Sequence, residues 1–108
     1  MIKSEFSANK LLATNKANGQ HDEVRTRLAL AKKTNSLHLN QLCLDTVLPE
    51  VFSLKNLVRL DLSFNNIVKL SPRIGDLQAL QQLWLNDNPL REVPLEIAKC
   101  HKLRVSNV

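Results

Sequence analysis

The chain has 108 residues, of which 44% are hydrophobic and 4% aromatic, so any core that it buries must be mainly aliphatic. Its formal net charge is +5, and it contains no apolar run long enough to cross a bilayer, which excludes a membrane-spanning helix. Two cysteines, Cys43 and Cys100, do not form the framework of a disulfide-rich secreted protein, and the first residues do not resemble a secretory signal. We therefore expect one domain in a cytoplasmic, intracellular setting.

The N-terminal part, residues 1–21, has little hydrophobic periodicity and is rich in Asn and Lys. We expect this segment to be weakly ordered. The pair Asn18-Gly19 is expected to break any helix within it.

Residues 22–33 predict an amphipathic helix. Asp22 is the expected N-cap, and Glu23 and Arg27 are spaced for a pair one turn apart. The apolar side of this helix consists of Val24, Leu28 and Ala31. Such a helix would cover the open end of the elements that follow it.

Two later segments, 57–79 and 80–102, repeat one pattern, L-x-x-L-x-L-x-x-N-x-L, at a spacing of 23 residues. A fixed period of this length predicts units that stack and bury a shared core. A degraded copy precedes them over 34–56, with Leu42 in the place of the asparagine, and the start of a fourth strand follows from Leu103. The folded domain is expected to span 22–108.

Each copy predicts one strand and one irregular segment. Leu60 and Leu62 alternate with polar residues, as in a strand that buries one face, and Ser63 is expected to point outward. Asn65 and Asn88 follow the strands and are expected to close the turns as a structural asparagine ladder. Pro72 and Pro94, in the second halves of the two later copies, favour a 3-10 or irregular start to the outer segment.

Residues 28–108 resemble the short intracellular leucine-rich-repeat proteins with 23-residue repeats. The resemblance is carried by LVRLDLSFNNIVKLSPRIGDLQAL at 57–80 and LQQLWLNDNPLREVPLEIAKC at 80–100, and ALAKKTNSLHL at 29–39 is similar to their entry into the first strand. The resemblance implies an α/β leucine-rich-repeat solenoid. Its short parallel sheet would form the concave face, its convex side would be irregular or 3-10, and an N-terminal helix would cap it.

The outward strand residues are the candidate binding site. They stack in columns across the copies, and the single tryptophan, Trp84, falls among them, which is the composition of a protein-binding hot spot. The expected contacts of a protein partner on the concave face are Trp84, Asp61, Arg59, Phe64, His38, Gln82 and Asn86. For Phe64, a structural role before the turn is as plausible as a binding role.

The sequence gives little support for catalysis or metal binding. His38 and Asp61 have the residue types of a hydrolase, but the sequence has two glycines in all and no nucleophile-elbow motif, and a zinc site would lack further ligands. Cys100 takes a core leucine position, where it acts as a small hydrophobic residue. We expect no enzyme activity, no cofactor and no metal site.

Positive charge is concentrated before the repeats. Arg25, Arg27, Lys32 and Lys33 could attract nucleic acid or anionic lipid, but no aromatic residues are interleaved with them. A solvated helix face is the simpler interpretation, and a nucleic-acid partner is not expected.

The function expected from the sequence is an adaptor or scaffold that binds a protein. The alternative is a structural fragment or subunit that self-associates, or joins a larger complex such as a cytoskeletal one, through an uncapped C-terminal edge, as in a truncated form of a longer repeat protein.

Overall fold

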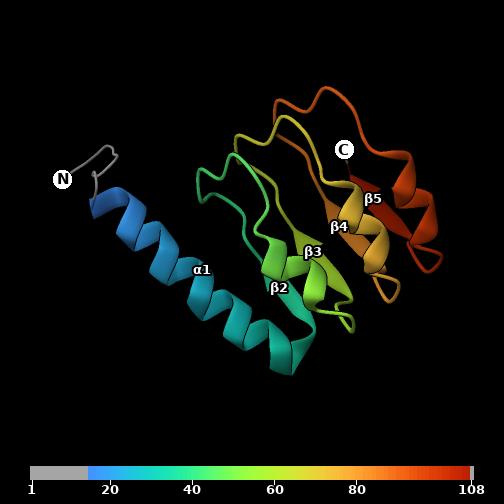
Figure 1. Cartoon of the computed structure of the whole chain (residues 1–108), viewed down its shortest axis with the longest axis horizontal. Coiled ribbons are helices and arrows are strands. Elements are labelled where there is room, and N and C mark those ends of the chain that lie inside the picture. Colours follow the sequence, from blue (N-terminus) through green and yellow to red (C-terminus); the bar gives the residue numbers. More distant parts are fainter. Residues whose placement is uncertain (1–14, 108) are drawn as a thin grey trace.

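The computed structural model describes residues 15–107, which form a helix, a parallel sheet and short 3-10 helices in alternation (Figure 1). The helix is α1 (Asn15–Thr34), and the strands are β2 (Ser36–His38), β3 (Arg59–Asp61), β4 (Gln82–Trp84) and β5 (Val105–Asn107). The 3-10 helices are η1 (Pro49–Ser53), η2 (Pro72–Asp76) and η3 (Leu95–Lys99). The four strands lie in the order β2-β3-β4-β5, so each copy of the pattern adds one strand beside the previous one.

The strands pair in the register that the 23-residue period predicts. Leu37 pairs with Leu60 and Leu60 with Leu83, and all three side chains are fully buried. The ladder continues beyond the strands, since the Leu39 amide donates to the Asp61 carbonyl and the Leu62 amide donates to the Trp84 carbonyl, both at 2.8 Å. The predicted small parallel sheet is therefore confirmed.

An aliphatic core fills the space between the sheet and the 3-10 helices. Each strand leucine packs against apolar residues of the outer segments, among which Val51 and Ile74 are fully buried. The same positions recur in successive copies, so the core is continuous through the stack. Its further fully buried members are Leu39, Phe52, Leu57, Leu62, Ile67, Leu70, Leu77, Leu80 and Leu85.

Proline starts two of the three outer 3-10 helices. Pro49 and Pro72 occupy the first positions of η1 and η2, where the missing N–H is not needed and the fixed φ suits the turn. Ser71 caps η2, with its hydroxyl accepting from the Arg73 amide at 3.1 Å. The predicted 3-10 character of these segments is confirmed.

Helix α1 begins earlier than the sequence predicts. It runs from Asn15, passes through Gly19, and places Asp22 inside the helix, so both the break and the N-cap expected there are wrong. The physical reason is that glycine in a helix costs only about 1 kcal/mol relative to alanine, which the packing of the later turns overcomes. The order expected for residues 1–14 lies outside the described residues.

The C-terminal half of α1 packs against the first strand. Val24 and Ala31 are buried in the core, and Leu28 packs against it. The helix ends because Asn35 adopts a left-handed conformation, with φ of 60°, and its amide donates to the Ala31 carbonyl at 2.8 Å. Arg27 donates one N–H to the His38 carbonyl at 2.8 Å, which covers the outer edge of β2.

Candidate functional site

The outward residues of the strands form the columns that the sequence predicts. Ser36, Arg59 and Gln82 are register partners in successive strands. His38, Asp61 and Trp84 form the second column, so His38 lies beside Asp61 and Asp61 beside Trp84. We call the surface made by these two columns the strand face; it is the side of the sheet away from the buried leucines.

The strand face is polar and accessible around one aromatic residue. Arg59 and His38 are exposed, and Asp61, Gln82 and Trp84 are half-buried. The short strands place these side chains without help from long loops, since alternate residues of a strand point to opposite sides. The surface is thus a shallow platform with a large apolar side chain in its third strand.

Ser63 departs from the prediction that it points outward. Its side chain is buried, with 6% of its area exposed. The reason is the carboxylate of Asp61, whose Oδ1 accepts from the Ser63 amide at 3.0 Å and from the Ser63 hydroxyl at 2.6 Å. These bonds hold the Asp61 side chain over the end of β3.

The hydrogen bonds between Asp61 and Ser63 give no support to a catalytic pair of His38 and Asp61. One oxygen of Asp61 is engaged by Ser63, and the structure assigns no hydrogen bond between Asp61 and the His38 side chain among the described residues. No group of three or more His, Cys, Asp or Glu side chains within residues 15–107 is arranged to hold a metal ion. Over the same residues, no helix is long and apolar enough to cross a membrane.

Phe64 occupies a strained position beside the strand face. Its φ is 57°, in the left-handed region that bulky residues rarely adopt, and 52% of its side chain is exposed. Gln41 and Asp87, at the equivalent places in the neighbouring copies, have φ values of 58° and 61°. The turn geometry therefore recurs, and the sequence alone does not reveal it because none of the three residues is glycine.

Asn65 joins two successive turns. Its side-chain oxygen accepts from the amides of Leu42 and Leu44, each at 3.0 Å, and its amide group donates to the carbonyls of Leu39 and Leu62, each at 2.9 Å. The side chain is buried, with 6% exposed. A buried amide that both donates and accepts satisfies backbone groups that the tight turn leaves without partners.

Asn88 makes the matching set one copy later. Its oxygen accepts from the Ile67 amide at 3.0 Å, and its amide group donates to the carbonyls of Leu62 and Leu85 at 2.9 and 3.1 Å. The side chain is half-buried. Asn86, one of the predicted contacts, is half-buried as well and donates to the Asp87 carboxylate at 2.8 Å.

The two cysteines lie in different surroundings and are not paired with each other. Cys43 is exposed, whereas Cys100 is buried and donates its thiol hydrogen to the Ile74 carbonyl at 3.2 Å. Burial raises the pKa of the Cys100 thiol. The interpretation of Cys100 as a core residue agrees with this position.

Comparison with known proteins assigns the repeated pattern. The family described as leucine rich repeats (2 copies) matches residues 55–97. Leucine-rich repeat protein 1 of Homo sapiens is 54% identical over 48 residues, which cover 44% of this chain and 11% of that protein. Leucine-rich repeat protein 1 of Mus musculus is 61% identical over 44 residues, or 39% of this chain and 10% of that protein.

The similarity to the two relatives is strong but short, since the matched segment covers about a tenth of the length of each. Leucine-rich repeats generally mediate contacts between proteins and are typically non-enzymatic. The period, the parallel strands, the turn asparagines and the match over 55–97 agree, and this part of the chain consists of leucine-rich repeats.

Proposed function

We propose that the chain is an intracellular, non-enzymatic adaptor that binds a protein through the strand face, with Trp84 as the central contact. The proposal rests mainly on Trp84, which is half-buried in the middle of a polar surface. Tryptophan is enriched among the residues that contribute most to protein binding.

Phe64 supports the same surface. Phe64 is exposed, and exposed aromatic side chains are enriched in protein interfaces. Phe64 lies three residues after the end of β3, whereas Trp84 lies in β4, so an extended partner segment crossing the strands can contact both. Arg59 would supply a charged hydrogen bond that fixes the direction of the segment.

Helix α1 has a separate role in this proposal. It covers the leucines of the first copy on the β2 side and leaves the outward side chains of the sheet uncovered. We assign it as the cap of the stack, in the sense that it replaces a preceding repeat.

The test is the loss of binding in Trp84→Ala. The purified chain is used to capture partners from a lysate, the captured protein is identified and purified, and its affinity is measured by calorimetry. Trp84→Ala is expected to weaken binding by about 2 kcal/mol or more, roughly thirtyfold. The matched control is Leu95→Ala, which removes an exposed apolar side chain, 90% accessible, from η3 rather than from the sheet. Equal affinity of Trp84→Ala and the wild-type chain would remove Trp84 from the site.

A further inference from the structure

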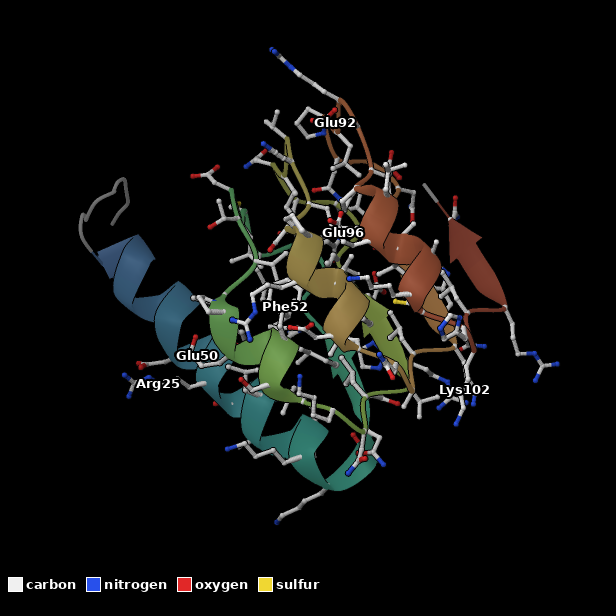
Figure 2. The ribbon with its side chains drawn as sticks, turned by 45° about the vertical axis from the view of Figure 1, so that its right-hand side comes forward. Arg25, Glu50, Phe52, Glu92, Glu96 and Lys102 are labelled. Atoms are coloured by element: carbon white, nitrogen blue, oxygen red, sulfur yellow. The ribbon has the colours of Figure 1, made fainter. Side chains whose placement is uncertain are left out.

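Charge is separated between the two edges of the sheet. We call the segments that lead into the strands the lower edge (residues 32–35, 53–58, 76–81 and 99–104), and those that follow the strands the upper edge (residues 40–50, 63–73 and 86–96). The two sets of loops lie at opposite sides of the molecule in Figure 1, and Figure 2 shows Lys102 and Glu92 at these opposite sides. Separation of this kind does not show in the net charge.

The lower edge is basic. Its exposed cationic side chains are Lys32, Lys33, Lys55, Lys99, Lys102 and Arg104. The carboxylate in the same loops, Asp76, is held by Arg73 at 3.4 Å. Among the residues that the structure describes, the lower-edge cations take part in no ion pair. The upper edge has the opposite balance, with Asp45, Glu50, Asp87, Glu92 and Glu96 against Lys69, Arg73 and Arg91.

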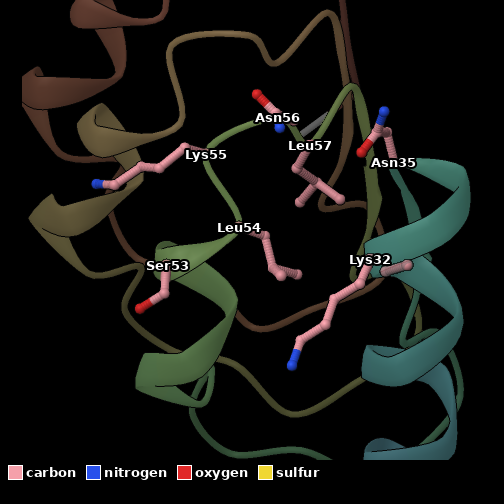
Figure 3. A pocket seen from close by; sticks show the side chains of 8 residues that line it. Lys32, Asn35, Ser53, Leu54, Lys55, Asn56 and Leu57 are labelled. Atoms are coloured by element: carbon pink, nitrogen blue, oxygen red, sulfur yellow. The ribbon is translucent and has the colours of Figure 1, made fainter.

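A hollow opens at one end of the lower edge, where α1 meets the segment after η1. Its volume is about 320 Å³, and its floor is apolar, formed by Ala31, Leu54 and Leu57. Figure 3 shows Leu54 and Leu57 between the helix that carries Lys32 and the chain that carries Lys55. Lys32 extends along one wall of the hollow, and Lys55 starts at the opposite rim and points away from it along the edge (Figure 3). A hollow of this size, with an aliphatic floor and cations beside it, suits an apolar side chain flanked by carboxylates.

We propose that the lower edge binds an acidic segment of a protein partner, which places one apolar side chain in the hollow between α1 and η1. Its carboxylates contact Lys32 and Lys55 and then the cations of the last loop, residues 99–104. The edge crosses four strands, about 14 Å at about 4.8 Å per step, which an extended segment of roughly five residues spans. This surface is separate from the strand face, so the two proposals stand or fall independently.

The chemistry of the edge favours a protein over a nucleic acid. The lower-edge residues include no Phe, Tyr or Trp on which a base could stack. Leucine side chains form the floor of the hollow instead. Positive charge alone would attract phosphate, but the leucine floor gives an aliphatic side chain a place that a phosphate would not fill.

The experiment uses a fluorescent peptide made of Glu and Asp with one central leucine, and a second peptide in which serine replaces that leucine. Binding to the wild-type chain is measured by anisotropy. The leucine peptide is expected to bind more tightly than the serine peptide, and raising the salt concentration about tenfold should weaken binding of both. The double variant Lys32→Glu/Lys55→Glu should lower the affinity about tenfold or more.

Matched controls separate the possible outcomes. Lys69→Glu/Arg91→Glu makes the same charge change on the upper edge and should leave binding unchanged, as should Trp84→Ala on the strand face. Equal loss in Lys69→Glu/Arg91→Glu, equal affinity of the two peptides, or no binding of the leucine peptide at millimolar concentration would overturn the proposal. So would tighter binding of labelled oligouridylate that displaces the peptide, because it would assign the edge to nucleic acid.

Discussion

The first repeat (residues 34–56) and the two that follow it (57–79 and 80–102) place their strands in one register, although only the later two carry the turn asparagine. The hydrogen bonds explain the difference. Asn65 accepts from amides of the first repeat and Asn88 from an amide of the second, so each asparagine completes the turn before its own. The first repeat follows α1, whose amides are bonded within the helix, and it has no earlier turn to complete.

The largest effect is expected from Asn65→Ala. It removes the acceptor of the Leu42 and Leu44 amides and the donor to three carbonyls, so the free energy of unfolding should fall by about 3 kcal/mol. Asn88→Ala should cost less, about 2 kcal/mol, because Asn88 accepts from one amide and is only half-buried. Urea denaturation measures both.

The control for this pair is Asn66→Ala, which removes an exposed amide side chain next to Asn65 and should change stability by less than about 0.5 kcal/mol. A loss in Asn88→Ala as large as that in Asn65→Ala would contradict the comparison between the repeats.

Gly75→Ala should have the next largest effect, since it tests how closely the second and third repeats approach on the outer side. A Cβ at this position would lie 2.9 Å from the Glu96 carbonyl oxygen and 3.2 Å from Cδ of Lys99. The backbone oxygen cannot swing away as a side chain can, so we expect a loss of about 2 kcal/mol.

The equivalent residue one repeat later is Ala98, which is exposed. Ala98→Ser therefore serves as the control and should leave the denaturation midpoint nearly unchanged. An unaltered midpoint for Gly75→Ala would show that η2 and η3 can separate without cost.

The left-handed turn is common to all three repeats, and valine substitutions test it. Gln41→Val and Asp87→Val should each lose about 1 kcal/mol, because a β-branched residue fits poorly at φ near 60°. Gln41→Asn and Asp87→Asn are the controls, since asparagine tolerates this conformation. Thermal unfolding that ranks valine equal to asparagine at both sites would argue against a shared strain.

A smaller effect distinguishes the cysteines of the first and third repeats. Cys43 is exposed and should react with a thiol reagent at once, whereas buried Cys100 should react about a hundredfold more slowly. Equal rates would show that the outer part of the third repeat opens readily.

The pH dependence of stability also tests whether Cys100 is buried in the folded chain. Burial raises the pKa of Cys100 in the folded chain above its ordinary value of 9.0, so the neutral thiol is favoured on folding. This contribution is fully present below that value and is lost as the pH rises through the folded-state pKa. The free energy of unfolding of the wild-type chain should therefore decline more steeply above pH 9.0 than that of Cys100→Val.

The smallest difference is expected at Leu42, where the later repeats have asparagine. Leu42 is half-buried against the core, so both Leu42→Asn and Leu42→Ala lose apolar contact. Because no earlier turn needs an asparagine here, the two variants should agree within about 0.5 kcal/mol. A clear advantage of asparagine over alanine would mean that the amide finds partners at the end of α1.

The period predicted the strand register and the buried leucines because both follow from spacing alone, as at Leu37, Leu60 and Leu83. It did not predict features that depend on a second side chain or on backbone angles. Ser63 is buried through its hydrogen bonds to Asp61. Phe64 adopts a left-handed backbone conformation, which its residue type does not predict. The start of α1 lies earlier than the sequence predicts, because a single glycine lowers helix stability too little to end a helix.

The candidate site was predictable in part. The columns around Trp84 follow from the register, and the exposure of His38 and Arg59 agrees with it. The basic lower edge also follows from the repeat period, since Lys32 and Lys55 are separated by one period of 23 residues. Only the folded chain, however, brings them to a common hollow with Leu54 and Leu57.

The backward reach of the asparagines gives folding on the ribosome a direction. The Leu44 amide obtains its side-chain acceptor from a residue 21 positions later, and the Ile67 amide likewise. At a synthesis rate of roughly 5–20 residues per second, each turn emerges about 1–4 s before the side chain that completes it. The newest repeat of the growing chain is therefore the least stable one at every moment, and the point of vulnerability moves along with translation.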